Sequence, residues 1–338
     1  MRIKYHYIDL RLRHIFTISR SSKAVEPCVI VELEHEGLVG LGEAAPSERY
    51  GETRETVETF LAKVDMRRFP EPFQLDEILG YVQGLLPGNA SAKAAIDMAL
   101  HDWIGKKLQL PLWKLWGFDR TRTPRTSFTI GIDELPVIEQ KVREAEPYPI
   151  LKVKVGAPND ENIIKTIRRI TDKPIRVDAN EGWKSKEQAA EKILWLEEQG
   201  VEFIEQPMPT SDPDGTAWVR ERVNIPLIAD ESVIDISSIP KLQGVFDGIN
   251  IKLMKCGGLR EALRMIHTAK AVNMKVMLGC MIESSVAISA AAQLSPLADY
   301  ADLDGNLLIT NNPYRGVDVV GGKLVLNDES GIGVEARD

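Results

Sequence analysis

Short strand-like runs alternate with helical segments through the second part of the chain, from Thr123 onward. The runs are short and rich in apolar residues, and segments with helical spacing such as 187–199 and 259–272 lie between them. This alternation is typical of βα units around a parallel sheet. The predicted strands are residues 127–132, 150–155, 175–178, 203–205, 227–230, 248–253, 275–279 and 301–304. Eight strands in about 180 residues predict a (β/α)8-type barrel.

The first 120 residues have a different pattern of predicted strands and helices. Residues 1–45 predict three antiparallel strands with a hairpin turn at Glu36-Gly37, and residues 53–64 and 91–110 have helical spacing. Small strands followed by helices indicate an α+β unit. The glycine-rich segment 313–338 has short β-like runs, so we expect it to return to this first unit. The predicted domains are therefore 1–120, 121–312 and 313–338.

Composition excludes several classes of function. A chain of 338 residues with a net charge of −8 gives no reason to expect nucleic acid or an anionic membrane as a partner. No apolar run approaches the roughly 20 residues of a membrane span, and residues 1–14 have no apolar core like that of a signal peptide. Three widely spaced cysteines fit a reduced, cytoplasmic protein better than a disulfide framework. The histidines and cysteines show no metal-ligand spacing.

Acidic residues follow three successive predicted strands, at the edge of a barrel where catalytic groups lie. They are Asp178, Glu205 and Asp230. Neighbouring strands lie about 4.8 Å apart, so three carboxylates can converge on one point. Oxygen ligands without histidine or cysteine suit a hard cation, Mg²⁺ before Zn²⁺. A single carboxylate of this kind is more often a helix cap or a surface ion pair, so the prediction depends on the whole set.

Lysines flank the acidic set. Lys152 and Lys154 point the same way from one predicted strand, and Lys252 ends another on the far side of the acids. A base on each face of a metal-bound carboxylate is what removal and return of an α-proton from opposite faces requires. The metal would stabilise the resulting enediolate. A Lys-x-Lys pattern alone is weak, since it also occurs on solvated edge strands.

Asp302 and Asp304 lie two residues apart on the last predicted strand. Two carboxylates in this spacing face one way and can hold a cation. A solvated strand end is the alternative interpretation.

With these motifs the chain resembles the enolase superfamily, in its muconate-lactonizing subgroup, where a lysine base and Mg²⁺ are established chemistry. Within that subgroup it is similar to the dipeptide epimerases. The resemblance extends over essentially the whole chain. The motifs that carry it are Gly42-Glu43-Ala44, Lys152-x-Lys154, Asp178-Ala179-Asn180, Glu205-Gln206-Pro207, Asp230-Glu231-Ser232, Lys252-x-x-Lys255-x-Gly257-Gly258, the segment from Gly279 to Ser284, and Asp302-Leu303-Asp304-Gly305.

The resemblance implies a (β/α)7β form of the TIM barrel with an α+β capping domain, built from the N-terminal region and the C-terminal tail. It implies one Mg²⁺ per subunit, a dipeptide substrate and a homo-oligomer. The implied acid/base pair is Lys154 and Lys252. Implied substrate contacts are Lys152 to the carboxylate, Asp302 and Asp304 to the free ammonium group, and Thr129 and Cys280 in the pocket wall.

The implied reaction is epimerisation of an L-Ala dipeptide at its C-terminal residue, and the best-known member acts on L-Ala-D/L-Glu from murein peptides. Arg20 and Lys23 lie in the first predicted loop of the capping domain, where either could pair with a glutamate side chain, and residues 47–53 form a second loop. Three alternatives stay open. They are an apolar second residue, an o-succinylbenzoate synthase or N-acylamino acid racemase, and a catalytically silent metal-binding protein. The Asp302 and Asp304 pair argues against the second, and the lysine set against the third.

Overall fold

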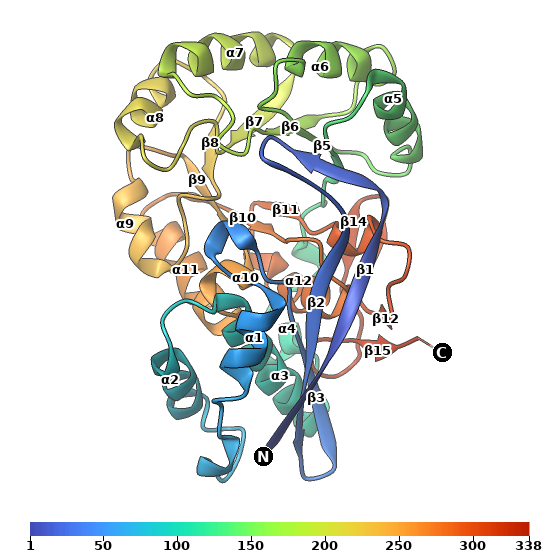
Figure 1. Cartoon of the computed structure of the whole chain (residues 1–338), viewed down its shortest axis with the longest axis vertical. Coiled ribbons are helices and arrows are strands. Elements are labelled where there is room, and N and C mark those ends of the chain that lie inside the picture. The colour runs from blue at the N-terminus through green and yellow to red at the C-terminus, as the bar shows by residue number, and fades with distance from the viewer. Residues whose placement is uncertain (338) are drawn as a thin grey trace.

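An eight-stranded parallel sheet dominates the computed structural model, which describes residues 1–337 (Figure 1). Its strands are β4 Phe128–Ile130, β5 Leu151–Lys154, β6 Ile175–Asp178, β7 Val201–Glu205, β8 Leu227–Ala229, β9 Gly248–Ile251, β10 Lys275–Gly279 and β11 Tyr300–Asp302. They are hydrogen-bonded in chain order, and a parallel bridge from Thr126 to Ala301 joins the two ends. The predicted barrel is therefore confirmed. β8 and β11 end at Ala229 and Asp302, so Asp230 and Asp304 lie just beyond them.

Helices connect the strands and surround the sheet (Figure 1). They are α5 Leu135–Glu144, α6 Asp160–Arg168, α7 Lys186–Glu198, α8 Pro213–Arg220, α9 Ile239–Leu242, α10 Leu253–Cys256, α11 Leu259–Ala271 and α12 Ser285–Ala292. Their apolar stripes face the strands, as Ile163, Ile164 and Ile167 of α6 do. Because helices cover the outer face, every residue of β5, β6 and β9 is buried. The charged side chains of these strands consequently lie inside the protein.

The N-terminal region forms an antiparallel sheet with helices against one face. Its strands are β1 Arg2–Ile18, β2 Ser21–His35 and β3 Leu38–Ala44, and its helices are α1 Arg54–Leu61, α2 Leu75–Leu85, α3 Ala90–Leu108 and α4 Leu112–Leu115. The alanine-rich α3 packs so closely on β3 that a Cβ at Gly40 or Gly42 would collide with its backbone carbonyls. β1 continues to Ile18, where it pairs with the start of β2 and also contacts barrel backbone at Leu308 and Ile132.

Two buried carboxylates of the N-terminal region cap helices of the barrel. Asp97 of α3 accepts hydrogen bonds from the backbone N–H groups of Leu259 and Arg260 at the start of α11, at 2.6 and 3.3 Å. Glu43 at the end of β3 accepts from the backbone N–H groups of Ser284 and Ala287 at the start of α12, at 2.8 and 3.1 Å. These bonds satisfy donors that a helix cannot satisfy itself.

The C-terminal segment contacts both parts. It contains β12 Tyr314–Arg315, β13 Asp318–Val320, β14 Lys323–Val325 and β15 Glu335–Ala336. Gly331 exchanges backbone hydrogen bonds with Leu110 and Leu112, and Gly322 accepts one from Thr126. Asp338, the last residue of the predicted third segment, lies outside the described residues. Short 3₁₀ helices occur at Glu48–Tyr50, Met66–Arg68, Arg120–Arg122, Ile236–Ser238, Ser295–Leu297 and Gly305–Leu307. Within residues 1–337, no helix combines the length and apolar character needed to cross a membrane.

Candidate active site

Three buried carboxylates meet at the end of the central strands. Asp178 and Glu205 end β6 and β7 as paired neighbours, and Asp230 directly follows β8. One carboxylate oxygen from each lies within 4.8 Å of the other two. The parallel sheet thus brings together side chains that are about 25 residues apart in sequence.

The carboxylate cluster fits a hard divalent cation. Glu205 Oε1 accepts a hydrogen bond from Asn250 Nδ2 at 2.7 Å, whereas its buried Oε2 has no hydrogen-bond partner among residues 1–337. Lys152 Nζ lies 2.6 Å from that Oε2 atom, but outside hydrogen-bonding geometry. Burial and the charge of Asp178 raise the pKa of Glu205 to about 7. A cation bound among these oxygens would offset both effects, and an all-oxygen donor set is the kind that Mg²⁺ prefers.

Lys152 lies among the acidic residues. Its Nζ atom is 2.6 Å from Asp302 Oδ2, 2.6 Å from Glu205 Oε2 and 3.0 Å from Asp178 Oδ2. Burial alone would lower the pKa of Lys152, but these three charges outweigh it and hold the pKa well above its usual range. These three carboxylates therefore stabilise the charged form of Lys152.

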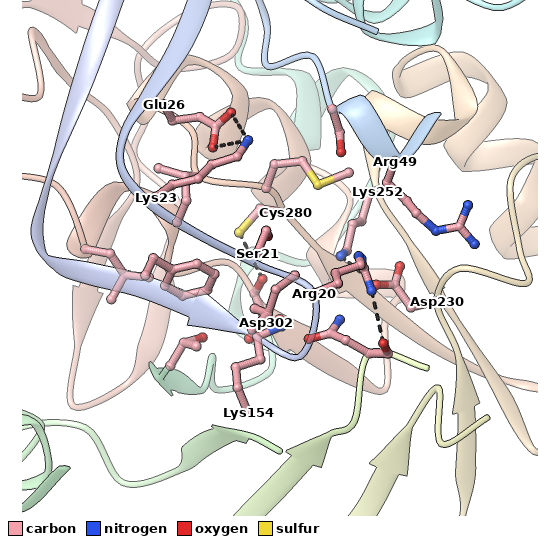
Figure 2. A pocket seen from close by; sticks show the side chains of 18 of the residues that line it. Arg20, Ser21, Lys23, Glu26, Arg49, Lys154, Asp230, Lys252, Cys280 and Asp302 are labelled. Atoms are coloured by element: carbon pink, nitrogen blue, oxygen red, sulfur yellow. Dashed lines mark hydrogen bonds and ion pairs between the residues drawn. The ribbon is translucent and has the colours of Figure 1, made fainter. Parts of the chain in front are cut away.

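Lys154 and Lys252 lie on opposite flanks of the carboxylate cluster in the strand order. Lys154 Nζ, from β5, donates to Asp178 Oδ2 at 2.6 Å. Lys252 Nζ, just after β9, donates to Asp230 Oδ2 at 2.8 Å. Figure 2 shows the two side chains entering the pocket from different sides. A substrate bound between them would have an amine near each face.

Asp302 and Asp304 form a second acidic group at the end of β11. Asp302 Oδ1 accepts from Ser127 Oγ at 2.7 Å, and Asp304 Oδ2 accepts from the backbone N–H of Thr129 at 2.6 Å. Burial and the charge of Asp302 raise the pKa of Asp304 to about 7. A cationic ligand would relieve this repulsion, so the pair is suited to an ammonium group. Cys280 is adjacent, with its Sγ donating to the Asp302 carbonyl at 3.2 Å.

A cavity of about 360 Å³ connects these groups. The barrel contributes to its wall Thr129, Lys152, Lys154, Asn180, Asp230, Lys252, Cys280, Met281, Ile282, Asp302, Asp304 and Leu308. The N-terminal region contributes Phe16, Ile18, Arg20, Ser21, Lys23, Glu26, Pro46, Ser47, Glu48, Arg49 and Tyr50. Every predicted catalytic and substrate-contact residue therefore lines one cavity, with the carboxylates of Asp178 and Glu205 beside it.

Both predicted specificity residues are in ion pairs, and Figure 2 shows the pair of Lys23 with Glu26. Arg20 Nη1 lies 2.7 Å from Glu231 Oε1 and donates to the Asn180 carbonyl at 3.1 Å. Its Nε and Nη2 atoms make no hydrogen bond within residues 1–337, so they can still receive a ligand. Lys23 Nζ is 3.0 Å from Glu26 Oε1, a carboxylate of its own strand.

Sequence reasoning missed several residues that support the acidic cluster. Lys255 Nζ lies 2.5 Å from Asp230 Oδ1, and Gln206 Oε1 accepts from the Asp230 backbone N–H at 3.0 Å. Asn250 of β9 donates to Glu205 and lies two residues before Lys252. Lys255 and Gln206 lie in motifs used for the family resemblance. Their position in these motifs could have indicated that they support the acidic cluster.

Comparisons with known proteins give one consistent result. Residues 5–117 match the mandelate racemase / muconate lactonizing enzyme N-terminal domain, and residues 137–338 match the enolase C-terminal domain-like family. The chain is 51% identical over 335 residues to an L-Ala-D/L-Glu epimerase of Bacteroides thetaiotaomicron, covering 99% of this chain and 88% of that protein.

Two solved structures extend this likeness to three dimensions. The substrate-liganded L-Ala-D/L-Glu epimerase from Bacillus subtilis has a TM-score of 0.92 at 30% identity, covering 99% of this chain and 98% of that one. The dipeptide epimerase from Enterococcus faecalis, complexed with Mg and L-Leu-L-Tyr, has a TM-score of 0.89 at 35% identity, covering 98% of each chain.

Proposed function

Because the chain belongs to the enolase superfamily, in the branch of mandelate racemase and muconate lactonizing enzyme, we propose that it is a Mg²⁺-dependent dipeptide epimerase. It would invert the α-carbon of the C-terminal residue in L-Ala dipeptides, with L-Ala-D/L-Glu as the preferred pair. The observation that carries the proposal is the placement of Lys154 and Lys252 on opposite flanks of the carboxylate cluster. The identity to the Bacteroides thetaiotaomicron epimerase supports the substrate.

Asp178, Glu205 and Asp230 would hold the Mg²⁺. When bound, the ion supplies positive charge beside the substrate carboxylate and so makes the α-proton more acidic. Lys152 adds a positive charge on the same side. One of Lys154 and Lys252 removes the α-proton, and the other delivers a proton to the opposite face. Because the two lysines exchange roles with the epimer that binds, both directions of the reaction need both residues.

The free ammonium group of the substrate distinguishes a dipeptide from an N-acylated amino acid. Asp302 and Asp304 are buried, and the raised pKa of Asp304 reflects burial and the adjacent charge of Asp302. Lys152 already pairs with Asp302, so a substrate ammonium group would neutralise Asp304, whereas an acyl group would leave the Asp304 charge uncompensated. The acidic pair therefore favours a dipeptide over the substrates of N-acylamino acid racemase or o-succinylbenzoate synthase.

An acidic second residue is favoured by Arg20. Its Nε and Nη2 groups remain available in the pocket, and a planar guanidinium binds carboxylates through two parallel hydrogen bonds. Lys23, near the start of β2, is a second cation in the cavity wall, and it is paired with Glu26. An apolar second residue is the alternative, because Phe16, Ile18 and Met281 also line the cavity.

Exchange of solvent deuterium into L-Ala-L-Glu, followed by NMR and chiral analysis, tests the proposal. We expect Mg²⁺-dependent exchange at the glutamyl α-carbon with formation of L-Ala-D-Glu, and no dehydration of any acid. Lys154→Ala and Lys252→Ala should each abolish inversion. Lys165→Ala is the matched control, since Lys165 forms an exposed pair with Glu161 on α6. Inversion that survives in either active-site variant would exclude the two-base assignment.

A homo-oligomer and a cytoplasmic location are also proposed. The three cysteines are all free thiols, as expected of a reducing compartment. Light scattering after size exclusion, and fractionation of cells, would test these two points.

A further inference from the structure

Glu181 lies in an unusual piece of backbone, three residues beyond the proposed metal ligand Asp178. Asn180 and Glu181 have φ angles of 44° and 64°, in the left-handed region that non-glycine residues rarely adopt. The Glu181 N–H donates to the Gln206 carbonyl at 2.9 Å, and its own carbonyl accepts from Lys184 Nζ at 2.6 Å. Strained backbone of this kind persists only where its surroundings hold it, and it is common near functional sites.

The Glu181 carboxylate binds a loop of the N-terminal region. Arg49 forms a two-pronged ion pair with it, through Nε to Oε2 at 3.1 Å and through Nη2 to Oε1 and Oε2 at 3.1 and 3.0 Å. Glu181 Oε1 also accepts from the backbone N–H of Thr210 at 3.0 Å, and Arg20 Nη1 lies 4.0 Å from Oε2. The Glu181 side chain is 12% exposed and that of Arg49 is 35% exposed, so the pair lies at the edge of the interface between the two regions.

The same barrel loop also holds the tip of the β1–β2 hairpin. The Asn180 carbonyl accepts from Ser19 Oγ at 2.9 Å and from Arg20 Nη1 at 3.1 Å. The left-handed turn at Asn180 and Glu181 therefore contacts two separate segments of the N-terminal region, residues 19–23 and residues 46–51.

Both segments form walls of the active-site cavity, which contains Arg20, Ser21 and Lys23 from the first and Arg49 and Tyr50 from the second (Figure 2). Glu181 is not among the residues that line this cavity. We propose that Glu181 is a positioning residue for the proposed epimerase, one that fastens both segments over the bound dipeptide. It acts through Arg49 and Arg20 and does not touch the substrate.

Removing the Glu181 charge should weaken substrate binding more than it slows the chemical step. In Glu181→Gln the two-pronged pair with Arg49 is lost, while Lys154, Lys252 and the metal ligands keep their contacts. We expect KM for L-Ala-L-Glu to rise about tenfold and kcat to change less than about twofold. Arg49→Gln should raise KM in the same direction, and the double variant should be no worse than Glu181→Gln, because the contact with Arg49 is already lost in that variant.

Hydrogen–deuterium exchange of the free protein tests the contact without turnover. Peptides covering residues 19–23 and 46–51 should exchange faster in Glu181→Gln than in the wild type. Glu139→Gln is the matched control, because Glu139 pairs with Arg143 on the surface of α5. The charge-reversed pair, Glu181→Arg with Arg49→Glu, should restore slow exchange in residues 46–51 and much of the lost affinity.

Two results would overturn the proposal. One is unchanged exchange in both segments of Glu181→Gln, and the other is a loss of kcat with KM unchanged. If the wild type epimerises no dipeptide, the proposed function fails, and the exchange measurement alone then decides whether Glu181 fastens the two segments.

Discussion

Replacing Glu283 by glutamine should stabilise the protein at neutral pH. Glu283 follows β10 and is 2% exposed, and its Oε1 accepts from the Met281 backbone N–H at 2.9 Å. Burial, followed by the charge of Glu43, raises the pKa of Glu283 to about 8. Lys252 opposes this rise and Glu26 adds to it, but both effects are smaller. The folded protein therefore holds this carboxyl group protonated over much of the neutral range.

The sign of the effect follows from proton linkage. The ordinary pKa of a glutamate carboxyl group is 4.5, so between pH 4.5 and about 8 the folded state binds more protons than the unfolded state. Stability falls as pH rises through that window. At about 1.4 kcal/mol per pH unit, Glu283 costs roughly 3 kcal/mol at pH 7 and little at pH 5. Glutamine resembles the protonated form, and its carbonyl can accept the same bond from Met281, so the variant should avoid this cost.

Urea unfolding at pH 5, 7 and 8 measures the difference. We expect Glu283→Gln to match the wild type within about 1 kcal/mol at pH 5 and to exceed it by about 3 kcal/mol at pH 7. Glu191→Gln, at an exposed position on α7, should leave the pH profile of the wild type unchanged. The reasoning would be refuted if the free energy of unfolding of Glu283→Gln differed from that of the wild type by the same amount at every pH. It would also be refuted if the variant were less stable at every pH.

Other predictions concern the metal site, the helix caps and the ammonium group. Asn250→Ala removes the donor to Glu205 Oε1 and should weaken Mg²⁺ binding about tenfold by calorimetry, whereas equal affinity would contradict a supporting role. Asp97→Ala removes two caps of α11 and the partner of His101 at 3.3 Å, so the free energy of unfolding should fall by about 2–4 kcal/mol in urea. A loss below about 1 kcal/mol would show that the caps matter little. Asp304→Asn should raise KM for L-Ala-L-Glu but leave any residual activity on the N-acetylated dipeptide unchanged. Equal effects on both substrates would remove the role proposed for Asp304.

The fold was predictable because its signals are local. Short strand-like runs such as β5 and β6 alternate with segments of helical spacing, whereas the long β1 is followed directly by another strand. The carboxylate cluster was also predictable, since parallel strands place their C-terminal ends together and the acids come from three successive strands. The course of β1 as far as Ile18 was not, because pairing with the start of β2 and contacts with barrel backbone stabilise that end together.

Long-range partners could not be predicted from the sequence. Nothing in the neighbourhood of Glu43 indicates that it caps a helix starting 241 residues later. Arg20 is a loop cation by sequence, and only the folded chain pairs it with Glu231 and the Asn180 carbonyl. Such pairs can be identified only when it is known which loops meet in the fold. The type of each residue, taken alone, does not tell which loops meet.

Side chains of the N-terminal region cap two helices of the barrel, and this limits which parts of the chain can be exchanged with those of a relative. A chimera that takes residues 1–120 from another member would bring new specificity loops, but α11 and α12 would begin with bare N–H groups unless the donor also has acids matching Asp97 and Glu43. Gly258 must be retained as well, because a Cβ there would meet the Asp97 side chain. Exchange of only the loops at residues 19–23 and 46–51 would keep the capping hydrogen bonds of Asp97 and Glu43. It is therefore the change of specificity that costs the least stability.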